Sequence, residues 1–333
     1  MTRLGPWNLL ETLGETEQTV LWIAEHRHES VPAALRISKV HTEKTLRSAW
    51  LTANRRPALL DHANIVHHFD LGIVPDGELA GAPYVVTELV GDGSCAEVLG
   101  RLPWHEARRI LVGVLDALSH AHARGLTHLD LRPNKVLLDG GAPRLTGFGL
   151  RWARVERDQP QLSGPAEYLA PEQCEGRWRD WGPPTDLYAV GCLAWALVTG
   201  APPYTTGDVL QSHLFAPVGR LPVSAKVPMG LQPFLERMLH KDPAQRYHSA
   251  ADALWALSTL GPTDSSTVLG EFNRAEAETQ PIPDLDDEGE THIRRHKHTS
   301  VRSGDLPPCP RDGTAFALDA MRPCRARGCR CGP

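Results

Sequence analysis

The sequence has no hydrophobic run long enough to cross a membrane and no strong charge of either sign. Its longest nearly uncharged apolar stretch, Leu187 to Thr199, is shorter than the roughly 20 residues of a membrane-spanning helix and is typical of a buried helix. The N-terminus lacks the basic start and apolar middle of a signal peptide. The formal net charge is only −5, without the basic excess of nucleic-acid-binding proteins. We therefore expect a soluble cytoplasmic protein that binds neither nucleic acid nor a membrane.

The sequence also lacks pairs of cysteines separated by two residues, the spacing that is typical of structural zinc sites. Four of the seven cysteines lie in the last 25 residues: Cys309, Cys324, Cys329 and Cys331. Four thiolates suffice for a closed structural zinc site, but without the paired spacing we favour free terminal thiols over zinc. The remaining cysteines, Cys95, Cys174 and Cys192, lie far apart in globular sequence, where we expect reduced, partly buried thiols.

Strand patterns dominate the first third of the chain, and helical patterns dominate the next half. Short β-branched or aromatic runs predict strands at 7–13, 20–25, 33–38, 65–73 and 84–89, with one helix near 43–60. Helical spacing of apolar residues then predicts helices at 103–125, 185–199, 231–239 and 249–260. The prediction is an α+β, bilobal fold: a mostly β N-lobe at 1–90, an α-rich C-lobe at 91–261, and a ligand site between them.

Apolar periodicity ends after Pro262. An acidic block followed by a basic one predicts a disordered, charged linker over 262–308, and residues 309–333 form a cysteine-containing tail. Thr279 and nearby hydroxyl residues in acidic context are candidate sites for phosphorylation by an active kinase and recognition by a phosphothreonine-binding protein. A plain linker explains the same composition equally well.

Several motifs over residues 7 to 260 resemble those of the Hanks-type serine/threonine protein kinases of bacteria and occur in the same order. They are His62-Ala-Asn-Ile-Val, Tyr84-Val-Val-Thr-Glu-Leu-Val with Thr87 as gatekeeper, His128-Leu-Asp-Leu-Arg-Pro-Asn-Lys, Leu145-Thr-Gly-Phe-Gly, Ala166-Glu-Tyr-Leu-Ala-Pro-Glu, Thr185-Asp-Leu-Tyr-Ala-Val-Gly-Cys and Asp242-Pro-Ala-Gln-Arg. The resemblance implies the bilobal kinase fold and an ATP site between the lobes.

The positions that carry this family's chemistry hold other residues at many points. Kinase catalysis needs a glycine loop over the phosphates, a lysine–glutamate ion pair, two magnesium ligands and an aspartate that accepts the hydroxyl proton. By the resemblance, Gly14 is the remaining glycine of the loop, and the degenerate positions are Thr16 and Thr19 for glycines, Arg36 for the lysine, Ala53 for the glutamate, Leu129 for the catalytic-loop arginine, and Lys135 and Gly147 for the magnesium ligands.

Asp130 alone remains of the catalytic set. We therefore expect a pseudokinase, a signalling scaffold or allosteric regulator whose partner is a protein such as an active kinase or a phosphothreonine-binding protein. The alternative is a weakly active, ATP-dependent serine/threonine protein kinase in which Asp130 works with rearranged cations.

Nucleotide binding is a separate question from catalysis. The resemblance places six residues at the nucleotide: Gly14, Ala34, Arg36, Glu88, Val90 and Lys135. One hypothesis is that Lys135 partly replaces the charge of the metal, so that ATP or ADP binds without magnesium. The alternative is that Lys135 pairs with Asp130 and the cleft binds nothing.

Five further residues are expected to be structural. By the resemblance, Glu172 and Arg246 form a buried ion pair. Asp186 ties down the backbone of the catalytic loop, and His128 and Phe148 pack in the core.

Overall fold

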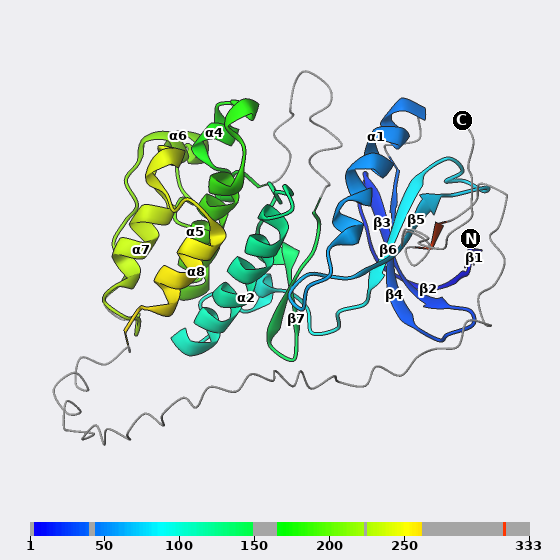
Figure 1. Ribbon diagram of the computed structural model, residues 1–333, viewed down its shortest axis with the longest axis horizontal. Coiled ribbons are helices and arrows are strands. Elements are labelled where there is room, and N and C mark those ends of the chain that lie inside the picture. The colour runs from blue at the N-terminus through cyan, green and yellow to red at the C-terminus, as the bar shows by residue number, and fades with distance from the viewer. Residues whose placement is uncertain (1–2, 40–43, 149–164, 223–224, 262–315, 318–333) are drawn as a thin grey trace, which may run out of the picture. The chain divides into compact units, whose positions relative to one another are not determined.

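The computed structural model describes residues 3–39, 44–148, 165–222, 225–261 and 316–317. The described residues up to 261 lie within one compact unit, and they form a β-rich N-lobe and a helical C-lobe (Figure 1). The α+β, bilobal prediction is therefore confirmed. The predicted linker and cysteine tail fall outside the described residues, apart from the short strand β9 (Phe316–Ala317).

A curled antiparallel sheet forms the N-lobe. In spatial order its strands are β1 (Arg3–Leu4), β2 (Trp7–Glu15), β3 (Thr19–His26), β4 (Pro32–Ser38), β6 (Pro83–Glu88), β5 (His68–Ile73) and β9. Apolar side chains such as Trp7, Leu35 and Val86 fill one face. All five predicted strands form, but the fourth begins at His68. The preceding Ile65 and Val66 instead contact Leu145, in a two-stranded hairpin of the C-lobe that is described below. The Val66 N–H donates to the Leu145 carbonyl at 3.0 Å.

One helix, α1 (Lys44–Arg55), packs against this sheet through a small cluster around Trp50 and Val85. The helix predicted near 43–60 contains Pro57, which we expected to kink or end it, and it ends at Arg55 before a short 3-10 turn, η1 (Pro57–Leu59). Proline lacks the backbone N–H that the helix ladder requires and clashes with the preceding turn. Pro57 therefore separates the two segments.

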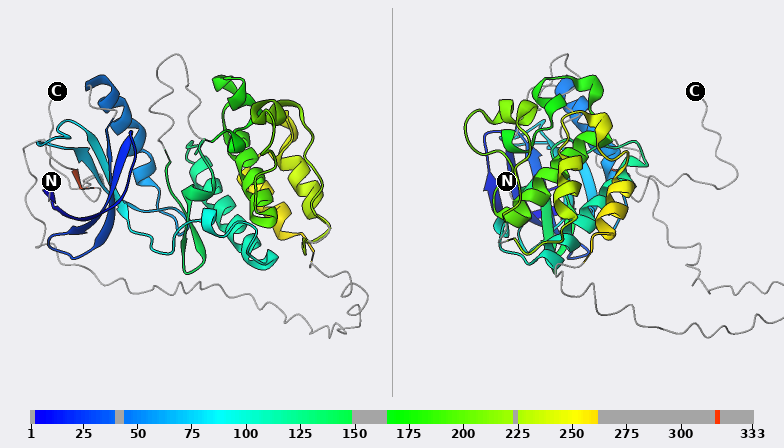
Figure 2. Two further views of the ribbon diagram at one scale, coloured as in Figure 1. Left: turned by 180° about the vertical axis from the view of Figure 1, so that it is seen from behind. Right: turned by 90° about the vertical axis from the view of Figure 1, so that its left-hand side faces the viewer.

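Six helices build the described C-lobe: α2 (Trp104–His122), α4 (Pro171–Cys174), α5 (Pro183–Thr199), α6 (Val209–Phe215), α7 (Leu231–Met238) and α8 (Ala250–Ser258). Helix α2 packs against both α5 and α8 (Figure 2), and Leu111, Leu118 and Leu193 are fully buried there. The four long predicted helices form. Helices α4 and α6 are too short to show an apolar period and were not predicted from the sequence.

A two-stranded hairpin, β7 (Val136–Asp139) and β8 (Ala142–Leu145), carries the loops that reach the cleft. Its turn uses Gly140 and Gly141, whose φ angles of 55° and 74° favour glycine.

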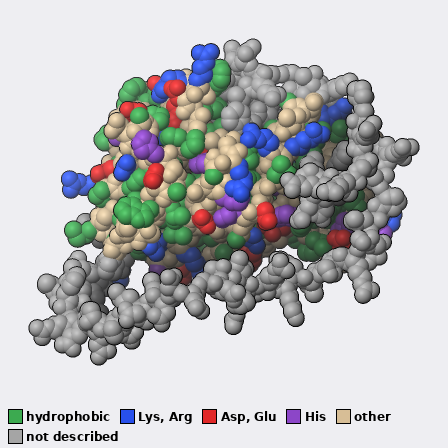
Figure 3. Space-filling view, in the orientation of Figure 1, with side chains coloured by type: hydrophobic (Ala, Val, Ile, Leu, Met, Phe, Trp, Pro, Cys, Tyr) green, Lys and Arg blue, Asp and Glu red, His purple; other side chains and the backbone are tan. Residues whose placement is uncertain are grey.

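Two further observations concern the surface and the helices of the described residues. Acidic and basic side chains are interspersed on the face shown in Figure 3, in line with the small net charge. Among the described helices, none combines the length and apolar character that crossing a bilayer requires.

Candidate functional site

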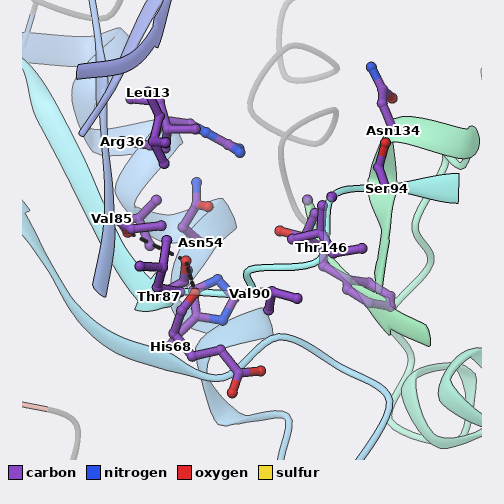
Figure 4. A pocket seen from close by; sticks show the side chains of 18 of the residues that line it. Leu13, Arg36, Asn54, His68, Val85, Thr87, Val90, Ser94, Asn134 and Thr146 are labelled. Carbon is purple, nitrogen blue, oxygen red and sulfur yellow. Dashed lines mark hydrogen bonds between the residues drawn. The ribbon is translucent and has the colours of Figure 1, made fainter. Parts of the chain in front are cut away.

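A cavity of about 450 Å³ opens between the two lobes, within the size range of small-molecule sites. Both lobes line it: Arg36 and Asn54 point into it from the N-lobe, with Asn134 and Thr146 on the other side (Figure 4). Of the residues predicted to bind nucleotide, Ala34, Arg36, Glu88 and Val90 line the cavity. Gly14 and Lys135 do not, and their neighbours Leu13 and Asn134 line it instead.

One end of the cavity is an apolar slot beside the segment that joins the lobes. Leu21 and Ala34 lie on the N-lobe side and Leu137 on the C-lobe side, with the segment from Glu88 to Val90 along the edge. The Glu88 carboxylate is engaged elsewhere, because it accepts the His67 N–H at 3.1 Å and lies 3.6 Å from Arg144. The slot is suited to a planar base that hydrogen-bonds to backbone groups.

The β2–β3 turn, where the family has its glycine loop, is closed by its own hydrogen bonds. The Thr16 hydroxyl accepts the N–H of Thr19 at 3.0 Å and that of Gln18 at 3.3 Å, and the Thr16 N–H donates to the Thr19 carbonyl at 2.8 Å. Lys39 donates to the Thr16 carbonyl at 3.0 Å and pairs with Glu15. The backbone N–H groups of Thr16, Gln18 and Thr19 are thus used within the turn.

Arg36, on β4, has no carboxylate partner on α1, since Lys44–Arg55 contains neither Asp nor Glu. The residue of α1 that faces the cavity is Asn54, whose buried amide donates to the Trp50 carbonyl at 2.8 Å. Ala53, the position expected from the resemblance, packs against the cluster around Trp50 instead. The assignment of Ala53 to the glutamate position stays a prediction, and the residue that lines the cavity is the next one along the chain.

His68 is a lining residue that the sequence did not single out. It lies on β5 opposite Thr87, it is buried, and its Nδ1 has no hydrogen-bond partner within the described part of the chain. Burial, with smaller contributions from His67 and Arg36, lowers its pKa to about 4, so the ring is neutral at physiological pH. In the sequence, only the position of His68 in the fourth predicted strand could have indicated that it lines the cavity.

The catalytic-loop backbone is held from the C-lobe core. The buried Asp186 carboxylate accepts the N–H of His128 at 2.8 Å and that of Leu129 at 2.6 Å. Leu129 has a φ of 62°, a strained angle for a branched side chain, and its carbonyl accepts from Gln173 at 3.0 Å. The His128 ring lies 4.8 Å from that of Phe148, and both are buried. The loop therefore keeps a fixed shape without the family's arginine.

A buried ion pair anchors the same lobe. Arg246 donates to both oxygens of Glu172, at 2.8 and 2.9 Å, and neither side chain is exposed. Thr185 also donates to this carboxylate at 2.8 Å. The ion pair expected from the resemblance is present.

Within the described part of the chain, three cations act on the Asp130 carboxylate. Arg132 Nε lies 3.6 Å from Asp130 Oδ1, and Arg36 and Lys135 both interact with the same carboxylate electrostatically. Burial and the charge of Arg36 lower the pKa of Lys135 to about 8, against the opposing effect of Asp130. Arg132 was missed in the sequence, although its place two residues after Asp130 on the same loop was the available signal.

Lys135 and Gly147, which replace the family's two magnesium ligands, lie side by side. A Cβ atom added to Gly147 would come within 3.2 Å of Lys135 Cδ and 3.4 Å of its Nζ. Magnesium prefers carboxylate and other oxygen ligands, and an ammonium beside a glycine supplies none. The residues present therefore do not fit the metal that the family uses at these two positions.

Comparison with known proteins agrees with the fold. The family model described as "Protein kinase domain" matches residues 7–255. The DNA damage-responsive serine/threonine-protein kinase RqkA of Deinococcus radiodurans is 31% identical over 84% of this chain and 43% of its own length. Serine/threonine-protein kinase Pkn1 of Myxococcus xanthus is 29% identical over 92% of this chain and 46% of its own length. This chain thus spans less than half the length of these relatives, and it belongs to the protein kinase family.

Proposed function

We propose that this kinase domain binds an adenine nucleotide between its lobes without magnesium and acts as a pseudokinase, a cytoplasmic signalling scaffold or allosteric regulator. The observation that carries the proposal is the Lys135 side chain packed beside Gly147, at the two positions where an active kinase holds its metal.

Two more features support the loss of phosphoryl transfer. In the β2–β3 turn, backbone N–H groups donate to acceptors within the turn itself. Arg36 has no carboxylate partner on α1. Preorganised electrostatic groups of this kind are each worth about 3 to 4 kcal/mol of barrier, although such effects are not additive. Losing several together leaves little catalysis, while the apolar slot for a base is retained.

An active serine/threonine protein kinase is the second candidate, and two observations favour it. Asp130 stands at the base position with Arg132 beside it. The relatives named above are called serine/threonine-protein kinases. In this candidate Arg36, Arg132 and Lys135 together neutralise the transferring phosphate.

A phosphorylation assay separates the two candidates. The full chain is incubated with radiolabelled ATP, a generic protein substrate and either magnesium or manganese, beside an Asp130→Asn variant. Transfer that Asp130→Asn abolishes would establish the kinase and refute the pseudokinase. Transfer no greater than that of the variant supports the pseudokinase.

Thermal unfolding tests nucleotide binding independently of catalysis. A ligand at 100 times its dissociation constant adds about 2.7 kcal/mol, which raises the Tm of a domain this size by roughly 5 to 11 °C. The expected result is a rise with ATP or ADP in the presence of EDTA. A rise that appears only with magnesium would favour the kinase.

The proposed partner is a protein, either an active kinase or a phosphothreonine-binding protein that recognises a phosphorylated Thr279. A regulator should bind and affect a purified active kinase as strongly with Asp130→Asn as without it. A variant that loses both the binding and the effect would argue against the scaffold role.

A further inference from the structure

Lys135 and Gly147, the two residues that replace the family's magnesium ligands, lie next to each other. Gly147 has a φ of 93° and no side chain, and the Lys135 stem and ammonium fill the space that a side chain there would need. A longer residue at 147 would displace the lysine. The lysine side chain thus takes up room that the glycine leaves, and it brings one positive charge to a position where the family uses a divalent ion.

The surroundings of this ammonium are strongly positive. Arg36 from β4 and Arg132 from the catalytic loop both act on Lys135 electrostatically, and Asp130 is the opposing carboxylate. Among the described residues, these three cations act on the Asp130 carboxylate, and Arg36 is the one of the three that lines the cavity. Because Arg132 already lies 3.6 Å from that carboxylate, the interpretation in which Lys135 simply neutralises Asp130 is less favoured.

We propose that Lys135, with Arg36 and Arg132, forms a phosphate-binding site that takes the metal-free form of an adenine nucleotide and discriminates against its magnesium complex. The proposal rests on the proposed nucleotide binding and adds which groups hold the phosphate. A magnesium ion on the phosphates would stand against the Lys135 ammonium without an oxygen ligand from residue 135 or 147. Magnesium therefore weakens binding here, the reverse of its effect at a metal-dependent site.

Calorimetric titration of the full chain with adenosine and with ADP tests the site, each in EDTA and in excess magnesium. Adenosine probes the apolar slot alone, and ADP adds the phosphates. We expect ADP in EDTA to bind about tenfold to a hundredfold more tightly than adenosine, the range for hydrogen bonds to charged groups. Magnesium should remove most of that advantage.

The Lys135→Met variant keeps the length of the stem and removes the charge. It should lose most of the advantage of ADP over adenosine, while its adenosine affinity, which also reports that the variant is folded, stays unchanged. Lys226→Met is the matched control, because Lys226 is an exposed lysine outside the cavity lining. It should behave as the unmodified protein.

The outcomes that overturn the proposal are distinct. If adenosine binds but ADP binds no more tightly, or only with magnesium, the phosphate site is wrong while the base slot stands. If Lys135→Met keeps the full advantage of ADP, another group holds the phosphate. If neither ligand binds, nucleotide binding itself is refuted together with the site.

Discussion

The Thr16 hydroxyl accepts the N–H of Thr19 at 3.0 Å within the β2–β3 turn, between Leu13 and Leu21, which both line the cavity. If this bond keeps backbone N–H groups of the turn from donating to phosphate, the Thr16→Gly substitution should release them. It also removes the Cβ atom that keeps a phosphate from approaching the backbone closely. We expect the affinity for ADP, measured in EDTA, to rise by about threefold to tenfold, the range of one ordinary hydrogen bond. The affinity for adenosine should not change.

The control for this variant is Thr16→Ser, which keeps the accepting hydroxyl and should leave both affinities as they are. An equal gain in Thr16→Ser and Thr16→Gly would mean that the turn does not limit phosphate binding. A gain in adenosine affinity would point to a general loosening of the N-lobe.

Restoring the family's magnesium ligands requires both positions at once. Gly147→Asp alone places a side chain at a φ of 93° against Lys135, which should cost about 1 to 3 kcal/mol of stability. It should also weaken ADP binding, because the new carboxylate pairs with Lys135. The double variant Lys135→Asn with Gly147→Asp removes that pairing, and its ATP affinity should become higher with magnesium than without it.

Titration calorimetry of ATP with and without magnesium checks this reversal, and denaturant unfolding gives the stability change. Lys135→Asn alone is the control, since it removes the ammonium and supplies only one ligand. If magnesium affects the double variant as it affects the unmodified protein, these two residues do not decide the metal response.

The order of motifs was enough to predict the architecture, because each motif marks an element that its own local chemistry supports. Helix α5 ends before Gly200 as predicted, although it begins at Pro183, two residues before the predicted Thr185. The Glu172–Arg246 pair followed from two distant motifs. The site was predicted less well where it depends on side-chain direction. The order of motifs does not determine which residue in the last turn of α1 lines the cavity, and the structure places Asn54 there, not Ala53. Arg132 and Lys135 lie in a segment without apolar periodicity, so the sequence pattern did not predict that they interact.

Binding of ADP in EDTA should depend on pH through Lys135. Burial and Arg36 lower the pKa of this lysine to about 8, so the ammonium is present below that pH and is lost above it. Arg36, Arg132 and Asp130 act on it electrostatically. His128 acts on it as well, and burial lowers the pKa of that ring below its ordinary value, so the ring gains no charge in this window. The second pKa of a phosphate is about 6, so the ligand stays fully charged as well.

Affinity should therefore be flat from pH 7 to about 8 and fall towards that of Lys135→Met at higher pH. Because bound phosphate stabilises the ammonium, the fall extends over the interval between the pKa of the free protein and the higher pKa of the complex. Adenosine affinity should stay constant. A fall of equal size in Lys135→Met would assign the titration to another group.

The ion pair of Glu172 and Arg246 offers a test of the scaffold that is independent of any ligand. Both side chains are fully buried, so Arg246→Met leaves a carboxylate that keeps, among the described side chains, the hydrogen bond from Thr185. The expected loss of unfolding free energy is about 3 to 5 kcal/mol. Arg177→Met is the matched control, because Arg177 pairs with Glu175 at a surface where its side chain is 46% exposed, and exposed pairs are worth about 0 to 1 kcal/mol. Denaturant unfolding of the full chain measures both. Equal losses would mean that the buried pair is not what holds this lobe together, whereas a large loss only in Arg246→Met would show that the C-lobe depends on this pair whether or not the domain transfers phosphate.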